Sequence, residues 1–212
     1  MDKVRVYYCN DAENEGLALH IDPAASLMDL LNAWQPLCDQ SAYRRKKYAS
    51  NLNQSCRACA HNCCDTAYVI PDLIAFKKMA RYTACSYESF VNQYFEAEKR
   101  AIGLLRMRPN PCVFLQDQIC TIYPIRALIC RFYLCIDLRG DTEEFIYHIS
   151  SLGMAATHKF ARQQGLLGNE NGPVSSMDQL FLRLFDEYDS SPLLSYFLQA
   201  ENYEDIPLQP FL

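Results

Sequence analysis

The sequence predicts a mainly α-helical protein of the α+β class, in which a few short strands surround a metal centre formed by two cysteine segments. Apolar residues recur at helical spacing through most of the chain beyond residue 70, whereas strand-like alternation is confined to short runs. Eleven of the 212 residues are cysteines, and they are concentrated in two segments. We expect an N-terminal extension over residues 1–50, a cysteine-cluster core over residues 51–140, and a C-terminal helical part over residues 141–212 packed on the same domain.

The N-terminal extension is expected to contain a small β unit and one helix. Two alternating apolar runs separated by a polar stretch predict a pair of strands, with Val4, Val6 and Tyr8 in the first and Leu17, Leu19 and Ile21 in the second. Ser26 and Asp29 have the spacing of a capping box, which marks the first turn of a helix. This helix is expected to end near Trp34, because Pro36 cannot donate a backbone hydrogen bond.

Two helices are expected between the cysteine segments, after a short strand at residues 68–70. Pro71 and Asp72 suit the opening of the first helix. Ser86 caps the second and longer helix, in which apolar residues recur at helical spacing over residues 90–105. The two cysteine segments are therefore expected to meet only in the folded chain.

The second cysteine segment is expected to form two short strands and one short helix. The apolar stretches Val113–Leu115 and Ile119–Cys120 flank a polar turn. Pro124 suits the first position of a helix, which is expected to cover residues 125–130. Residues 132–138 are expected to be extended.

Three amphipathic helices are expected after residue 138. The first ends at Gly165, the second includes Leu180 and Tyr188, and the third begins at Ser191. The tail over residues 203–212 contains two prolines and is expected to be irregular.

The composition excludes several classes of partner. The net charge of −5 argues against a nucleic-acid binder, since such proteins usually carry a basic excess. The first residues are charged and lack the apolar stretch of a signal peptide. No apolar run approaches the roughly 20 residues that cross a bilayer. We therefore expect a cytoplasmic protein without nucleic-acid or membrane partners, in which clustered cysteines bind metal rather than form disulfides.

The first cysteine segment has four thiols within nine residues: Cys56, Cys59, Cys63 and Cys64. The spacing Cys-x-x-Cys lets two thiolates reach one ion. The adjacent pair is less suited to one ion, because successive side chains diverge. One of these two thiols is therefore expected to serve a second ion or another iron of a cluster.

The second segment supplies three more candidate ligands, Cys112, Cys120 and Cys130. Seven thiols exceed one four-coordinate site, so they suit one complete site plus a three-ligand site with an open position, or a cluster with spare thiols. His61 or Cys135 could complete either arrangement. The remaining cysteines, Cys9, Cys38 and Cys85, are isolated and are expected to be ordinary core or surface residues.

A site of four thiolates around Zn²⁺ or a [4Fe–4S] core keeps a net charge of about −2 and favours cations nearby. Arg57, Arg126 and Arg131 lie closest in the sequence and are the candidates for this cofactor-binding role. Ordinary salt bridges are the alternative role for the same residues.

Both segments resemble a known family. Cys-Arg-Ala-Cys-Ala-His-Asn-Cys-Cys at residues 56–64, Cys-Val-Phe-Leu at residues 112–115, Cys-Thr-Ile-Tyr at residues 120–123 and Cys130-Arg131 are similar to the YkgJ-type cysteine-cluster family. This family is described as zinc- or iron-chelating, and flagellin lysine N-methylase is a related member. The resemblance covers about residues 56–135 and implies chelation of zinc or iron. Val113 and Ala127 stand where the family usually has proline, which leaves every thiol in place.

Several functions remain open at this point, and whether the chain is an enzyme is among the open questions. The first hypothesis is a metalloprotein with a redox or protein-modification role, such as lysine N-methylation of a protein substrate, at an iron–sulfur or mononuclear iron centre. The second is a non-enzymatic zinc module that stabilises a scaffold or binds a partner, and the third is metal handling. The glycines never form Gly-x-Gly, so a Rossmann-type site for a methyl donor is not expected.

Overall fold

The chain is mainly helical, as the sequence predicts, with two small antiparallel sheets among the described residues. The computed structural model describes residues 2–11, 14–39, 64, 67–169 and 172–212. The linker expected before the first cysteine, and that cysteine segment up to residue 63, lie outside the described residues.

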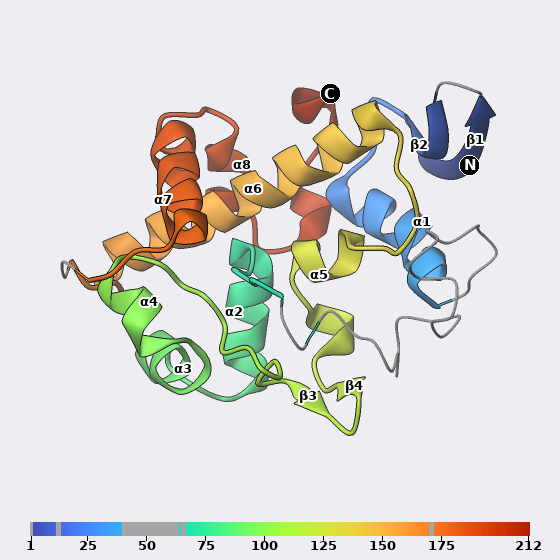
Figure 1. Ribbon diagram of the computed structural model, residues 1–212. Helices are drawn as coiled ribbons and strands as arrows, with labels where there is room; N and C mark the ends of the chain where they lie inside the picture. Colours follow the sequence, from blue (N-terminus) through green and yellow to red (C-terminus); the bar gives the residue numbers. More distant parts are fainter. Residues whose placement is uncertain (1, 12–13, 40–63, 65–66, 170–171) are drawn as a thin grey trace.

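The long helix α6 (Gly140–Gln163) runs through the middle of the molecule and organises the fold. In Figure 1, α2 (Leu73–Tyr82) and α5 (Leu128–Phe132) lie below it, and α7 (Ser176–Asp189) lies above it. α6 contacts all three of these helices, and it also contacts α8 (Leu194–Gln199). Segments from the cysteine region and from the C-terminal part therefore share one core.

The N-terminal β unit is confirmed as an antiparallel hairpin of β1 (Val4–Asp11) and β2 (Asn14–Ile21). Its register places Val4 opposite Ile21, so that the alternating apolar residues of both strands share one face. The strands extend further toward the turn than the alternating residues predict.

The hairpin is attached to the chain that follows the second cysteine segment. Leu17 N donates to Asp137 O at 2.8 Å, and Arg139 N donates to Leu17 O at 2.9 Å. Gly16 precedes this contact with a φ of +148°, and a Cβ there would lie 2.8 Å from the carbonyl carbon of Leu138. Glycine is required at this position because the two backbones approach so closely.

Helix α1 (Leu27–Asp39) begins at the expected capping box but continues past Pro36, so the expected end near Trp34 is wrong. Proline removes one backbone donor inside the helix, which is normally unfavourable. The last turn nevertheless buries Leu37 and Cys38 almost completely. Burial of these side chains in the core stabilises the turn that the backbone alone disfavours.

Residues 68–70 do not form the expected strand. Val69 and Ile70 are buried, and Val69 O accepts a hydrogen bond from Met107 N at 2.9 Å. Asp72 then caps α2, which confirms the expected start of that helix.

The long helix expected after Ser86 is wrong, because the chain forms two shorter helices, α3 (Tyr87–Tyr94) and α4 (Ala97–Ala101). Between them Phe95 is extended and pairs with Met107 in an antiparallel bridge. Phe95 is 1% exposed, and its ring packs against the rings of Phe76 and Phe90. The helical spacing continues in the sequence, but the tertiary contacts of Phe95 break the helix.

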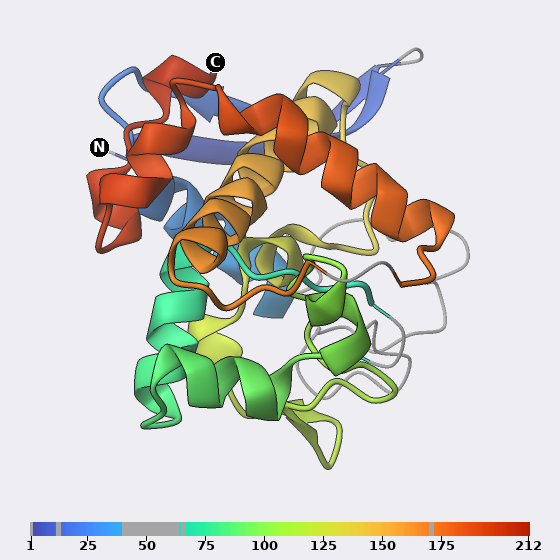
Figure 2. The same ribbon diagram turned by 90° about the vertical axis from the view of Figure 1, so that its left-hand side faces the viewer.

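The second cysteine segment folds into a short hairpin and two short helical turns. β3 (Leu115–Gln116) pairs with β4 (Ile119–Cys120) through a tight turn, in which Asp117 and Gln118 both have positive φ. The helix expected over residues 125–130 is divided into η3 (Tyr123–Ile125) and α5. Figures 1 and 2 both show the β3–β4 hairpin at the opposite edge of the molecule from the C-terminus.

The three C-terminal helices are confirmed as α6, α7 and α8. On α7, Leu180 is 57% exposed, whereas Asp178 and Phe185 are buried. The expected apolar face of α7 is therefore only partly buried.

The tail, expected to be irregular, forms η4 (Tyr203–Asp205) and η5 (Gln209–Phe211) and is packed in the core. Leu27 N donates to Ile206 O at 2.8 Å, which ties the tail to the start of α1. The prolines limit regular helix here, but they do not prevent burial of Tyr203 and its apolar neighbours.

Within the described part of the chain, no helix is both long enough and apolar enough to cross a membrane.

Candidate metal centre

The fold brings the ends of the two cysteine segments together. Cys112 N donates to Cys64 O at 2.8 Å, so the last cysteine of the first segment lies beside the first cysteine of the second. Cys56, Cys59 and Cys63 lie outside the described residues, as do Arg57 and His61.

The three cysteines of the second segment come from three different local structures. Cys112 lies in the turn before β3, where its carbonyl accepts a hydrogen bond from Leu115 N at 2.8 Å. Cys120 lies in β4 opposite Leu115, and Cys130 lies in α5. Each of these cysteines is half-buried.

The environment of these thiols disfavours the thiolate in the absence of a cation. Burial raises the pKa of Cys130, and the nearby thiols of Cys112, Cys64 and Cys120 raise it further. Burial also raises the pKa of Cys120, and it raises the pKa of Cys112 to about 11. The thiols of Cys64, Cys112, Cys120 and Cys130 therefore lie close enough to interact electrostatically.

The described thiols do not make a complete donor set by themselves. Within the described ranges, no group of three or more histidine, cysteine, aspartate or glutamate side chains could hold a metal ion. No disulfide joins two of the described cysteines. The donors that are present suit a soft or borderline cation such as zinc or iron, because such ions bind thiolate and favour its deprotonation.

Arg126 is placed as a cation beside the thiols. Its Nη1 donates to Tyr123 O at 2.7 Å, and its guanidinium lies 3.8 Å from the centre of the Tyr123 ring. Its charge opposes the effect of burial on the pKa of Cys120 and Cys130. Nη2 is buried without a hydrogen-bond partner among the described residues. This buried donor fits a neighbouring group that carries negative charge, as thiolates bound to a metal do.

Arg131 lies close to a different set of charges. Burial lowers its pKa, and the groups that raise it again include Tyr203 and Asp72. Its Nε donates to Arg126 O at 3.1 Å, and its guanidinium lies 5.7 Å from the centre of the Tyr203 ring. Cys38, which is buried, donates to Arg131 O at 3.3 Å. Arg131 therefore lies between the cysteine segment and a buried carboxylate.

Asp72 is a residue whose importance the sequence reasoning missed, since it was expected only to open α2. It is 1% exposed, and its carboxylate accepts hydrogen bonds from three separate segments of the chain. Burial raises the pKa of this carboxyl, and the hydrogen bonds and Arg131 oppose that effect. The only signal in the sequence that could have suggested the burial of Asp72 is the run of apolar residues on both sides of it.

The two histidines of the described C-terminal part are packed against aromatic rings. His148 Nδ1 lies 3.0 Å from the hydroxyl of Tyr188, and His158 stacks on Phe185 with ring centres 4.7 Å apart. Burial lowers the pKa of His158.

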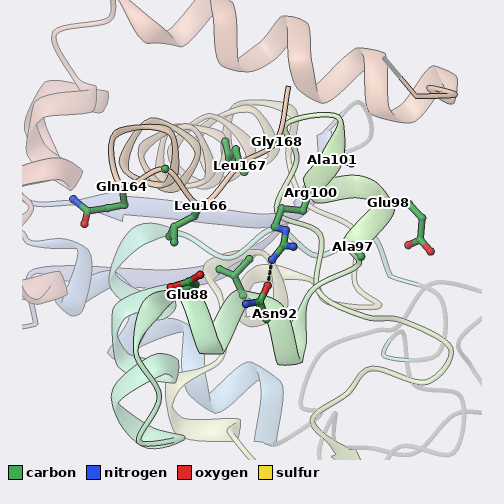
Figure 3. Close-up of a pocket in the computed structure, with 12 residues that line it drawn as sticks. Glu88, Asn92, Ala97, Glu98, Arg100, Ala101, Gln164, Leu166, Leu167 and Gly168 are labelled. Atoms are coloured by element: carbon green, nitrogen blue, oxygen red, sulfur yellow. Dashed lines mark hydrogen bonds between the residues drawn. The ribbon is translucent and has the colours of Figure 1, made fainter. Parts of the chain in front are cut away.

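A polar cavity of about 750 Å³ lies between α3, α4 and the chain that follows α6. Figure 3 shows Arg100 and Asn92 pointing toward each other at its wall, where they form a hydrogen bond. Its lining includes Glu88, Glu98 and Gln164 but no cysteine, so the cavity is separate from the candidate metal centre.

Comparison with known proteins supports metal binding by this part of the chain. Residues 55–150 match the CxxCxxCC family model, whose description reads "Putative zinc- or iron-chelating domain". No curated protein and no solved structure matched the chain.

The matched residues include both cysteine segments, the spacer helices α2 to α4, and the first part of α6. The resemblance to a cysteine-cluster family that the sequence indicates is therefore confirmed over residues 55–150, which are similar to the CxxCxxCC zinc- or iron-chelating domain.

Proposed function

We propose that the chain binds zinc or iron through seven cysteines of its two segments: Cys56, Cys59, Cys63, Cys64, Cys112, Cys120 and Cys130. The observation that carries this proposal is the hydrogen bond between Cys112 N and Cys64 O, which joins the two segments at 2.8 Å. The family match over residues 55–150 supports chelation as the shared property. Arg126, with its unpartnered buried Nη2, is the described residue best suited to balance the charge of the thiolates.

The finer function that we propose is a redox or protein-modification role at this centre, such as N-methylation of a lysine side chain in a protein substrate. The support is the excess of three thiols over the four that a closed site needs. A second ion with an open position, or an iron–sulfur cluster such as [4Fe–4S], would use that excess.

A non-enzymatic zinc module is the second candidate function. The hydrogen bond that joins Cys64 to Cys112 favours it, because an ion shared by the two segments would also stabilise the fold.

Metal analysis of the anaerobically purified chain tests the proposal. We expect zinc or iron in stoichiometric amounts, and a marked loss of that metal in Cys112→Ser and Cys64→Ser. Cys85→Ser is the matched control, because Cys85 is equally half-buried but donates to Thr83 O at 3.4 Å, outside both segments. Unchanged metal content in all three variants would refute the ligand set.

Acid-labile sulfide and visible absorption separate the two candidate functions. Sulfide with a thiolate-to-iron absorption band supports the redox or protein-modification role. Stoichiometric zinc without a chromophore refutes the iron–sulfur form and supports the zinc module.

A further inference from the structure

The carboxylate of Asp72 does more than cap its own helix. Oδ1 accepts from Ala75 N at 3.0 Å, which is the ordinary capping bond of α2. Oδ2 accepts from Leu128 N at 2.8 Å, and Oδ1 also accepts from the Tyr203 hydroxyl at 3.0 Å. Capping needs only one side-chain oxygen, so the other oxygen is available to another part of the chain.

The second oxygen acts as the cap of α5. Leu128 is the first residue of α5, and the residue before it, Ala127, has no side chain that could cap the helix. The amides of Cys130 and Arg131 both donate to Ala127 O, at 2.9 and 3.0 Å. The orientation of this single turn therefore depends on how its first amide is held, and the turn carries Cys130.

Asp72 is held firmly enough to serve as a fixed point. A Cβ on Gly153 of α6 would lie 2.7 Å from the Cβ of Asp72, so the central helix packs directly against it. Next to it, the Thr157 hydroxyl donates to Pro71 O at 2.7 Å. Arg131, whose charge interacts with Asp72, supplies a compensating cation.

We propose that Asp72 is a positioning residue of the metal centre, because its carboxylate holds the first amide of α5 and so sets the place of Cys130 relative to the other thiols. This inference rests on the proposed metal-binding function. Asp72 is not itself a ligand, and it acts through the backbone of Leu128.

Asp72→Ser tests this role, because serine can still cap α2 but is too short to reach Leu128. We expect the metal affinity of the variant to fall about 10- to 100-fold, the loss typical of residues that orient metal ligands, so that it releases its metal to a chelator faster than the wild type. Cobalt titration of the metal-free variant should also give a charge-transfer band that differs from that of the wild type, since one thiolate is displaced.

Thr157→Val is the matched control. It removes a buried hydrogen bond at the neighbouring Pro71 and keeps the bond to Leu128. We expect it to lower thermal stability while metal release and the cobalt spectrum stay as in the wild type. Tyr203→Phe, which removes only the hydroxyl bond to Asp72, should likewise change metal release by less than Asp72→Ser.

If Asp72→Ser releases metal no faster than Thr157→Val and gives the wild-type cobalt spectrum, the positioning role is refuted. If the serine variant does not fold, Asp72→Asn is tested instead. Its side chain keeps one oxygen that can accept a hydrogen bond, but its amino group is a donor and cannot accept one from a backbone N–H. Metal release to the chelator and the cobalt spectrum of this variant are then compared with those of Thr157→Val in the same way. A wild-type chain that retains neither zinc nor iron would overturn the proposed function itself, which is a result distinct from equal behaviour of the variants.

Discussion

At the scale of single residues, a second buried carboxylate joins the C-terminal part to the segment that follows the first cysteines. Asp178 is 0% exposed and accepts from the Tyr68 hydroxyl at 2.6 Å and from Lys99 Nζ at 2.7 Å. It also accepts hydrogen bonds from the backbone amide and the hydroxyl of Ser175, which form the capping box of α7. Burial opposes its ionisation, but these hydrogen bonds outweigh burial and hold the pKa of Asp178 well below its usual range.

We predict that Asp178→Asn lowers the free energy of unfolding at neutral pH by about 1.5–3 kcal/mol, the range for hydrogen bonds to a charged group. Because the folded-state pKa of Asp178 is depressed, its contribution is present above the unfolded-state pKa of about 4 and is lost as the pH falls below that value. Urea unfolding at pH 7, 5, 4 and 3 should show a steeper loss of stability in the wild type than in the variant.

Asp189→Asn provides the control for this prediction. Asp189 forms ion pairs with Lys159 and Arg162 at the surface, where such pairs contribute at most about 1 kcal/mol. Equal losses of stability in Asp178→Asn and Asp189→Asn would contradict a larger contribution from the buried hydrogen bonds of Asp178.

At the scale of elements, helix α6 places the other elements by close contact. Gly153 and Gly140 both belong to this helix. A Cβ added at Gly153 would lie 2.7 Å from the Cβ of Asp72, whereas a Cβ added at Gly140 would have no neighbour within 4 Å. Glycine disfavours a helix interior, so its presence at residue 153 is explained by packing and not by helix propensity.

We predict that Gly153→Ala lowers the free energy of unfolding by about 1–3 kcal/mol, as overpacking of a core does. Gly140→Ala, on the same helix, should leave stability unchanged or raise it by up to about 1 kcal/mol, because alanine restricts the unfolded chain. Thermal unfolding of the two variants checks this. A Gly153→Ala variant as stable as the wild type would show that α6 can shift away from α2.

Local sequence signals predict where several helices begin but not where they end. The helix starts at Ser26, Asp72 and Ser86 depend on residues within one turn, and the sequence predicts each of these starts. The break at Phe95 and the continuation of α1 past Pro36 were not predicted. Both depend on partners far along the chain, Met107 for the break and the core contacts of the last turn for α1.

At the scale of the whole molecule, the second cysteine segment packs on the helical core but has little regular structure of its own. Leu128 and Phe132 of α5 are buried in the same core as the residues of α1, α2, α6 and α8. The second cysteine segment has two-residue strands and helical turns of three to five residues, and elements this short depend on other interactions to persist.

We predict that removal of the metal by a chelator lowers the thermal midpoint and loosens the cysteine region first. A bound ion stabilises the folded state by mass action, so its loss is felt most where its ligands lie. Hydrogen exchange should accelerate over residues 112–132 while the amides of α6 remain protected. Uniform acceleration over both regions would show that the metal stabilises the whole fold as one unit, and no acceleration would argue against a metal between the two segments.

By itself, the sequence determined the helical class, the N-terminal hairpin, most helix starts and the two cysteine segments, because each of these depends on residues close together in the chain. It also indicated the resemblance to a cysteine-cluster family, since the spacing of thiols is a local pattern. Only the tertiary structure decided that Cys112 lies beside Cys64, that Arg126 lies near the thiols, and that Asp72 holds the helix of Cys130. The amide of Leu128 is 56 residues from Asp72, and no local pattern encodes a hydrogen bond over that separation. Such contacts form only when the packing of α2 and α5 against α6 brings the two segments together.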